Sequence, residues 1–369
     1  MSRGVIERYR ARLPVPADAA PISLDEGSTP LIEAPRLAER LGRGRVWLKL
    51  EGANPTGSFK DRGMTVAVTL AAHEGCRGVI CASTGNTSAS AAAYAARAGL
   101  KAFVVLPAGH VALGKLVQAV AHGARVIAIE GSFDAALELV RAAAARHGLA
   151  IVNSINPARI AGQMTAAYEV IEALGDAPDL LAIPVGNAGN VTAYGNGFED
   201  ARSRGEARTR TTLIGFQALG AAPFVRGAPI DNPETVASAI RIGRPASWAD
   251  ARHVVEASGG GFHAVSDAAI LEAQAWLARR EGVFAEPSSA APVAGLLELA
   301  GRGELPRFEN AVIVLTGHGL KDPDAVLCGT QPPRPVPATA GAVDEVIAAE
   351  LGGILPPPAK RGGEFGRKE

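Results

Sequence analysis

The chain has 369 residues, with 37 Lys and Arg against 37 Asp and Glu, and 47% hydrophobic residues. This length is sufficient for two domains with sizeable cores, and the zero formal charge predicts no surface for nucleic acid or an anionic membrane. The N-terminus lacks the apolar core of a signal peptide, and no apolar run reaches membrane-spanning length. Scattered Cys76, Cys81 and Cys328 favour free thiols over a metal site or disulfides. We therefore expect a soluble, cytoplasmic, metal-free protein.

After a Pro-rich, irregular N-terminus, short β-prone runs alternate with helical stretches. Strands are predicted at 45–50, 78–83, 103–107, 125–130, 180–185, 212–216 and 311–315. Helices are predicted at 87–98, 113–122, 133–147, from 156 to 174, 268–280 and 291–300. This alternation predicts an α/β fold of two doubly wound domains with parallel sheets. The predicted divisions are an N-terminal segment (1–46) packing on the large domain, a small domain (47–153), the large domain (154–330) and a mobile Pro- and Gly-rich tail (331–369).

A lysine occupies an unusual position in the segment 49–63, KLEGANPTGSFKDRG. The segment is typical of a strand end, a turn and a helix start, and Ser58 and Asp61 have the spacing of a capping box. Lys60 is then in the first helical turn, where the helix dipole disfavours a cation. One interpretation is a solvated surface lysine. The other is a lysine that loses its proton easily, as an imine-forming amine must.

Polar residues follow three further predicted strands. STGNTS (83–88) has more small polar residues than one helix cap needs and is able to surround a carboxylate or a ring oxygen. GNAGNV (186–191) offers backbone amides that suit a phosphate, although a tight strand–helix turn is the simpler explanation. The segment matches neither common nucleotide motif. TGHGLKD (316–322) places the Thr316 hydroxyl at a strand end, and we interpret His318 as a packing or hydrogen-bonding residue.

In α/β sheets, ligands bind beyond the carboxyl ends of strands, where these four segments lie. An imine-forming lysine, a phosphate cradle, a polar loop and a terminal hydroxyl together fit pyridoxal 5'-phosphate. For this cofactor, a protein supplies a Schiff-base lysine, a phosphate anchor and a partner for the ring nitrogen. The sequence therefore predicts a cofactor-dependent enzyme.

The chain also resembles the threonine synthase family, within the tryptophan-synthase-β-like fold of pyridoxal-phosphate enzymes (fold type II). The resemblance extends from about residue 27 to 323 and is carried by EGANPTGSFKDRG (51–63), ASTGNTSASA (82–91), EPSSAA (286–291) and TGHGLKDP (316–323). Among these, PTGSFK is typical of the superfamily. SFKDRG together with TGHGLKD narrows the resemblance to threonine synthases.

The resemblance implies roles for cofactor-binding residues. Lys60 is similar to the Schiff-base and catalytic lysine, Asn86 to the partner of the ring hydroxyl, and Thr316 to the hydroxyl that faces the ring nitrogen. A neutral threonine there leaves the pyridine mostly unprotonated. The cofactor phosphate loop implied by the resemblance comprises Gly186, Asn187, Ala188, Gly189 and Asn190.

Five further residues resemble substrate ligands. Ser83, Thr84 and Thr87 are similar to residues that hold the substrate carboxylate and its leaving phosphate. Ser154 and Arg159 lie in a segment, 153–159, that resembles the family's second phosphate-recognition segment. For Arg159, the residue type supports this role independently of the resemblance, because a planar guanidinium suits a phosphate dianion.

The implied reaction converts O-phospho-L-homoserine and water to L-threonine and phosphate. The resemblance also implies a homodimer. The close alternative is a threonine or serine dehydratase, which eliminates water and needs no substrate phosphate site. The segment 153–159 argues against it. A second alternative is a protein that binds the cofactor without turnover. Such a protein needs only Lys60 and one phosphate loop, so the second anion site at 153–159 argues against it. A dinucleotide-binding protein is disfavoured because the sequence lacks the dinucleotide fingerprint.

Overall fold

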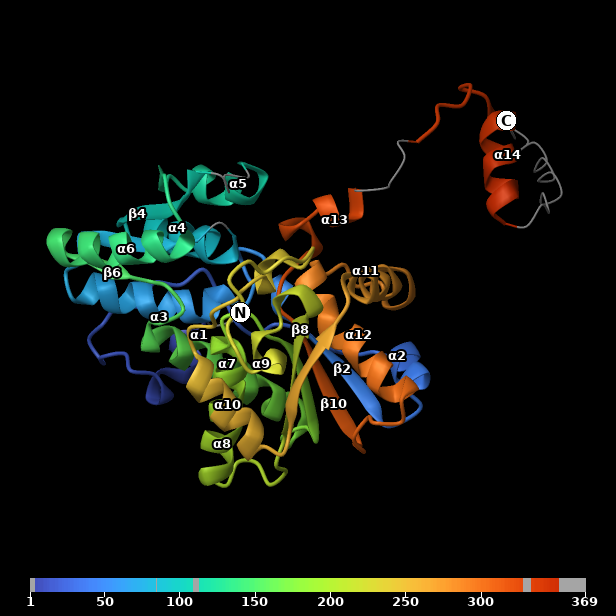
Figure 1. Ribbon diagram of the computed structural model, residues 1–369, viewed down its shortest axis with the longest axis horizontal. Coiled ribbons are helices and arrows are strands. Elements are labelled where there is room, and N and C mark those ends of the chain that lie inside the picture. Colours follow the sequence, from blue (N-terminus) through green and yellow to red (C-terminus); the bar gives the residue numbers. More distant parts are fainter. Residues whose placement is uncertain (1–3, 84, 109–112, 328–332, 352–369) are drawn as a thin grey trace, which may run out of the picture. The chain divides into compact units, whose positions relative to one another are not determined.

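The structure is a computed structural model that describes residues 4–83, 85–108, 113–327 and 333–351. The chain divides into two compact units, Met1–Ala325 and Val326–Glu369, and the second contains helix α14 (Ala340–Glu350) (Figure 1). None of the helices in the described ranges is long and apolar enough to cross a lipid bilayer.

The larger sheet of the first unit has six strands. Its strands are parallel except for the first, which pairs antiparallel to its neighbour. In order across the sheet they are β1 (Leu31–Glu33), β2 (Arg45–Leu50), β10 (Asn310–Leu315), β7 (Leu180–Pro184), β8 (Thr212–Ala218) and β9 (Gly261–Val265). Strand β7 is buried along its whole length, which explains why its sequence is continuously apolar rather than alternating.

The smaller sheet has four parallel strands. In order they are β5 (Arg125–Ile129), β4 (Lys101–Pro107), β3 (Gly78–Ala82) and β6 (Leu149–Ile151). Helix α6 (Phe133–His147) closes a small core against this sheet, in which Ile80 and Val105 face Ala136 and Val140. In Figure 1, α4 and α6 lie with this sheet at one end of the first unit, away from β2 and β10 of the larger sheet.

Helices cover both sheets and join them. Besides α6 and α14, the described residues form the helices α1 (Val5–Tyr9), α2 (Pro35–Leu41), α3 (Lys60–His73), α4 (Asn86–Arg97), α5 (Leu113–Ala121), α7 (Pro157–Leu174), α8 (Gly189–Ser203), α9 (Pro223–Arg226), α10 (Trp248–Ala257), α11 (Asp267–Trp276), α12 (Pro287–Gly301) and α13 (Asp324–Leu327). Helix α3 packs on both α4 and α7, and it thereby connects the two sheets.

The helices α3 and α7 cross with their backbones nearly in contact. A Cβ atom on Gly63 would lie 2.6 Å from the carbonyl oxygen of Arg159, and one on Gly162 would lie 2.1 Å from that of Arg62. Glycine is therefore required at both positions. The close approach fixes the start of α3, which carries Lys60, against the start of α7, which carries Arg159.

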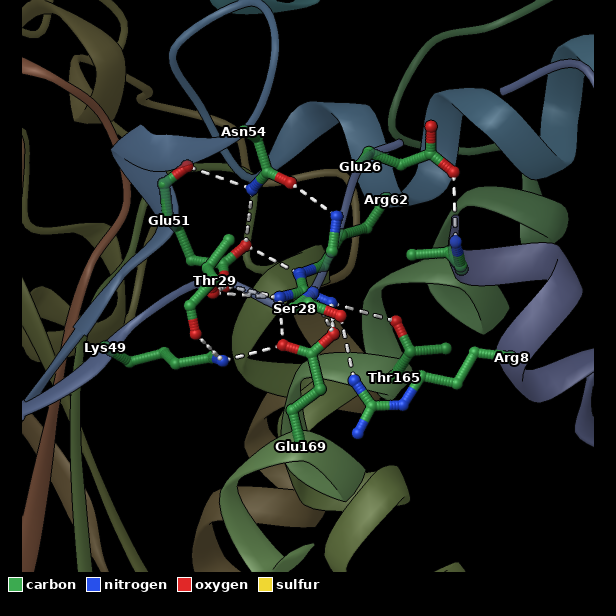
Figure 2. A network of polar contacts seen from close by, with 12 residues as sticks. Arg8, Glu26, Ser28, Thr29, Lys49, Glu51, Asn54, Arg62, Thr165 and Glu169 are labelled. Atoms are coloured by element: carbon green, nitrogen blue, oxygen red, sulfur yellow. Dashed lines mark hydrogen bonds and ion pairs between the residues drawn. The ribbon is translucent and has the colours of Figure 1, made fainter. Parts of the chain in front are cut away.

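A buried network of charges holds the same crossing together (Figure 2). The Arg62 guanidinium donates to Glu51 at 2.7 Å and to Glu169 at 2.6 Å. Lys49 Nζ donates to Glu169 at 2.7 Å and to the carbonyl oxygen of Thr29 at 2.8 Å. These two cations and two carboxylates form a neutral cluster that joins β2, α3 and α7.

The predicted α/β class with parallel sheets is confirmed, and each predicted strand has a counterpart in the structure. The prediction missed the short β1 and β6 as well as β9. It also placed strand 45–50 at the start of the small domain (47–153), whereas β2 pairs with β10 in the larger sheet. That pairing joins residues far apart in sequence, which a local pattern does not specify. The remaining domain divisions stay predictions.

Candidate active site

Three distant segments pair side by side at the carboxyl end of β10. Phe59 N donates to Thr316 O at 3.0 Å, and His318 N donates to Gly57 O at 2.9 Å. On the other side, Glu286 N donates to Gly317 O at 3.0 Å. These bonds place the lysine segment beside the residues that end β10, so the first and fourth sequence motifs meet.

Lys60 is the first residue of α3, as the sequence predicted. Its amine lies 3.8 Å from the ring centroid of Phe59. Burial, together with the positive charge of Arg159, lowers the pKa of Lys60 from 10.5 to about 7, while Glu286 opposes this shift. Near neutral pH, a large fraction of the amine is therefore neutral and nucleophilic.

The predicted capping box of Ser58 and Asp61 is wrong. The cap position of α3 is Phe59, and its side chain makes no capping bond. The Asp61 carboxylate instead accepts from Thr56 N at 2.7 Å and from the hydroxyls of Thr56 and Ser90, both at 2.6 Å. Asp61 thus ties the turn before α3 to helix α4. Ser58 Oγ is buried without a hydrogen-bond partner among the described residues.

Glu286 is a site residue that the sequence reasoning missed, although its motif had been singled out. Its buried carboxylate accepts from Asn86 Nδ2, at 3.1 Å to Oε2 and 3.3 Å to Oε1. Burial raises the pKa of Glu286 to about 6, against the lowering effects of Asn86, Lys321 and Lys60. The contact brings Asn86, at the start of α4, to the segment beside Thr316. The signal available in the sequence was the EPSSAA motif (286–291), which begins with this glutamate.

Lys321 lies beside a cavity next to the turn that precedes α3. Its amine donates to the Thr56 carbonyl oxygen at 3.1 Å and also contacts Gln118 Oε1 of α5. A cavity of about 380 Å³ opens here, lined by Gly52, Asn54, Pro55, Thr56, Gly57, Gly85, Asn86, Val117, Gln118, His318, Leu320 and Lys321. A larger hollow, of about 630 Å³, lies at the amino ends of β2 and β10 and contains none of the predicted site residues.

The Gly-rich turn after β7 is built to expose backbone amides. Ala188 has a left-handed backbone with φ of 67°, which directs the chain into α8 at Gly189. No side chain caps this 15-residue helix. Asn190 Nδ2 is buried and has no hydrogen-bond partner among the described residues. A helix N-terminus with an additional unsatisfied donor fits an anion such as a phosphate group.

The other residues of this turn are fixed by the loop opposite. The Asn187 carbonyl oxygen accepts from Ser247 N at 3.1 Å, and its side-chain oxygen accepts from Ala246 N at 3.4 Å. A Cβ atom on Gly186 would lie 3.0 Å from Ile240 Cα, so a residue larger than glycine would be crowded at this position. Because β7 and β10 are parallel neighbours, this turn and Thr316 lie at the same edge of the sheet.

Arg159 is fully buried with a largely unsatisfied guanidinium. Nη1 donates to the carbonyl oxygen of Val152 at 3.1 Å, while Nε and Nη2 have no partner among the described residues. Burial lowers the pKa of Arg159 to about 10, and the Cys81 thiol opposes this shift. A buried cation without a carboxylate partner is costly unless it binds an anion.

Asn153 brings the remaining predicted residues together. Its side chain donates to the Ala82 carbonyl oxygen at 2.9 Å and accepts from Ala82 N at 3.1 Å, so the ends of β3 and β6 are joined. Ser83 directly follows Ala82, and Ser154 directly follows Asn153; both serines are half-buried. Thr87 is buried in the first turn of α4, and Thr84 lies outside the described residues.

Other predicted features have structural roles. His318 Nδ1 accepts from Leu320 N at 3.1 Å and the ring packs edge-on against Phe284, in agreement with a hydrogen-bonding role. Cys76 and Cys81 are free thiols, while Cys328 lies outside the described residues. Among the described residues, no group of three His, Cys, Asp or Glu side chains is arranged to hold a metal ion.

The chemistry of the predicted site residues fits pyridoxal 5'-phosphate. A lysine with a lowered pKa, an anion cradle with an unsatisfied donor and a buried threonine hydroxyl lie along one edge of the larger sheet. A family model described as pyridoxal-phosphate dependent enzyme matches residues 22–317. The maize serine racemase structure has the same fold, with a TM-score of 0.71 and 20% identity over 95% of this chain and 99% of that one. The fold and the site thus define a pyridoxal-phosphate-dependent enzyme.

The particular family follows from more similar relatives. The threonine synthase of Synechocystis sp. is 56% identical over 326 residues, which cover 88% of this chain and 85% of that protein. The threonine synthase of Mycobacterium leprae is 54% identical over 345 residues, 93% of this chain and 96% of that protein. The chain belongs to the threonine synthases, a family of pyridoxal-phosphate-dependent lyases.

Proposed function

We propose that the protein converts O-phospho-L-homoserine and water to L-threonine and phosphate, with Arg159 as the residue that selects a phosphorylated substrate. The observation that carries this proposal is the buried Arg159 guanidinium with unsatisfied Nε and Nη2, close enough to Lys60 to lower its pKa. A dianionic phosphate satisfies both donors in a bidentate arrangement. A dehydratase, whose substrate has no phosphate, would leave them unpaired.

The proposed cofactor contacts divide among three elements. The amides of Gly186–Asn190, with the side chain of Asn190, hold the cofactor phosphate. Asn86 contacts the ring hydroxyl, and Thr316 faces the ring nitrogen. When bound, pyridoxal 5'-phosphate supplies an electron sink for the electron pairs left by proton removal from the substrate.

The protein's own residues then hold the substrate and move protons. The Lys60 amine, with its pKa near 7, takes a proton from the substrate Cα, releases it, and then takes a second proton from Cβ. Ser83, Thr84 and Thr87 hold the substrate carboxylate and its leaving phosphate. Thr87 lies in the first turn of α4, where the positive end of the helix dipole favours such anions. Arg159 and Ser154 hold the phosphate group on Cγ and stabilise its negative charge as the bond to Cγ breaks.

We also propose a homodimer, as the family resemblance implies. Light scattering of the purified protein is expected to give twice the chain mass. A monomer with full activity would contradict this part of the proposal only.

The ionisation of Lys60 leads to a pH prediction. Uptake of pyridoxal 5'-phosphate by the cofactor-free protein, followed by visible absorption, is expected to accelerate with pH around a midpoint near 7, because the neutral amine is the reactive form. Removing the Arg159 charge in Arg159→Met takes away one cause of the low pKa and is expected to raise the midpoint. A midpoint near 10.5 in the wild-type protein would show that Lys60 is not perturbed.

Two assays on the same protein test the reaction. Phosphate release from O-phospho-L-homoserine is expected to be stoichiometric with threonine formation and to exceed ammonia release from threonine by orders of magnitude. Lys60→Ala is expected to abolish both reactions and to change the visible absorption of the bound cofactor. Ammonia release as the faster reaction would instead identify a dehydratase.

A further inference from the structure

Two buried hydroxyl groups lie in contact where β10 meets the first turn of α12. Thr316 Oγ1 and Ser289 Oγ are 3.0 Å apart, and Ser289 has no exposed surface. Thr316 has an implied partner in the cofactor ring, whereas neither the sequence motifs nor the proposed function gives Ser289 a role.

The hydrogen bonds around Ser289 decide which hydroxyl donates. Ser289 Oγ accepts from Gly317 N at 3.0 Å. It has one proton for two possible acceptors, Thr316 Oγ1 at 3.0 Å and Gly317 O at 3.3 Å. Gly317 O already accepts from Glu286 N at 3.0 Å. The shorter contact and the occupied carbonyl favour donation to Thr316, which leaves the Thr316 proton for a different acceptor.

The backbone leaves this pair little freedom to rearrange. Gly317 is hydrogen-bonded to the α12 turn, and a Cβ atom at that position would lie 2.5 Å from the carboxyl carbon of Glu286. Thr316 O is held from the other side by Phe59 N at 3.0 Å. The two hydroxyls are therefore pre-organised before any ligand binds.

We propose that Ser289 is a positioning residue that makes Thr316 Oγ1 a hydrogen-bond donor to the ring nitrogen of the bound cofactor and so keeps this nitrogen unprotonated. This inference rests on the proposed function, in which Thr316 faces the ring nitrogen. An unprotonated pyridine nitrogen accepts a hydrogen bond from the Thr316 hydroxyl, whereas a protonated one donates a hydrogen bond and requires Thr316 Oγ1 to accept it. In that case Ser289 has to donate to Gly317 O instead, which is farther away, at 3.3 Å, and already accepts from Glu286 N.

The test measures the ring nitrogen directly. Wild-type, Ser289→Ala and Ser288→Ala holoenzymes are reconstituted with pyridoxal 5'-phosphate carrying ¹⁵N in the ring, and the ¹⁵N chemical shift is followed with pH. In Ser289→Ala, Thr316 Oγ1 is free to accept, so the protonated fraction of the nitrogen at a given pH is expected to rise on the order of tenfold, the effect of one hydrogen bond. Ser288 is the matched control, since it is equally buried in the same turn but accepts from Ala239 N at 3.1 Å.

A ¹⁵N shift in Ser289→Ala that follows the wild-type curve at every pH would overturn the inference, as would an equal change in Ser288→Ala. Should Ser289→Ala not fold, Ser289→Cys retains a weak donor of similar size and is expected to move the curve in the same direction by less. The readout needs no turnover. A Ser289-dependent shift without conversion of O-phospho-L-homoserine would refute the proposed substrate alone, and conversion without the shift would refute this inference alone.

Discussion

Arg159→Met is expected to lower kcat/KM for O-phospho-L-homoserine about 100- to 1,000-fold, because two charge-assisted hydrogen bonds to the substrate phosphate are lost. The same substitution removes a buried charge that no carboxylate in the described part of the chain neutralises. Its thermal midpoint is therefore expected to stay unchanged or to rise. Loss of activity with a gain in stability distinguishes a ligand-binding arginine from a structural one.

Steady-state phosphate release and thermal melting of the same preparation measure both effects. Arg204→Met is the control, since Arg204 is an exposed arginine at the C-terminal end of helix α8 that pairs with Asp200 at 2.9 Å. It is expected to change kcat/KM less than twofold. An Arg159→Met enzyme with wild-type kcat/KM would remove the support for a second phosphate site. A large loss of stability would show that the guanidinium holds the fold together instead.

Glu169→Gln is expected to reduce the free energy of unfolding by about 3–5 kcal/mol, because it leaves the buried Arg62 and Lys49 with only one carboxylate. Burial by itself favours the neutral acid, but Arg62 and Lys49 hold the pKa of Glu169 well below its usual range. A carboxyl with a depressed pKa stabilises the fold fully above its unfolded pKa of about 4.5, and this contribution is lost as the pH falls. The difference between wild type and variant is therefore expected to shrink only in acid.

Urea denaturation of the two proteins at neutral and acidic pH measures this difference. Glu199→Gln is the matched control, because Glu199 pairs with Arg202 at 2.6 Å on an exposed helix face. Surface pairs contribute between about 0 and 1 kcal/mol, so little change is expected. Equal effects of the two substitutions would mean that the cluster in Figure 2 is not the main support of the α3–α7 crossing.

Much of this protein could be predicted from local patterns. Apolar runs that alternate with helical stretches predicted the parallel sheets, because strands buried on both faces have no polar positions. Lys60 was placed in a first helical turn, and the Gly-rich segment after β7 was predicted to expose amides. These features depend on neighbouring residues, whose steric and hydrogen-bonding preferences act over a few positions.

Tertiary contacts decided the rest. The Asp61 carboxylate binds Thr56 and Ser90 rather than capping its own helix, because burial brought a distant hydroxyl closer than the helix amides. Glu286 meets Asn86 across 200 positions of sequence, and no local pattern specifies that pairing. Local sequence patterns were therefore sufficient for the fold class, the family and the residue types of the site. Which polar atoms are satisfied, and which remain available to ligands, follows from the folded arrangement, since desolvation and pairing depend on everything that surrounds a group.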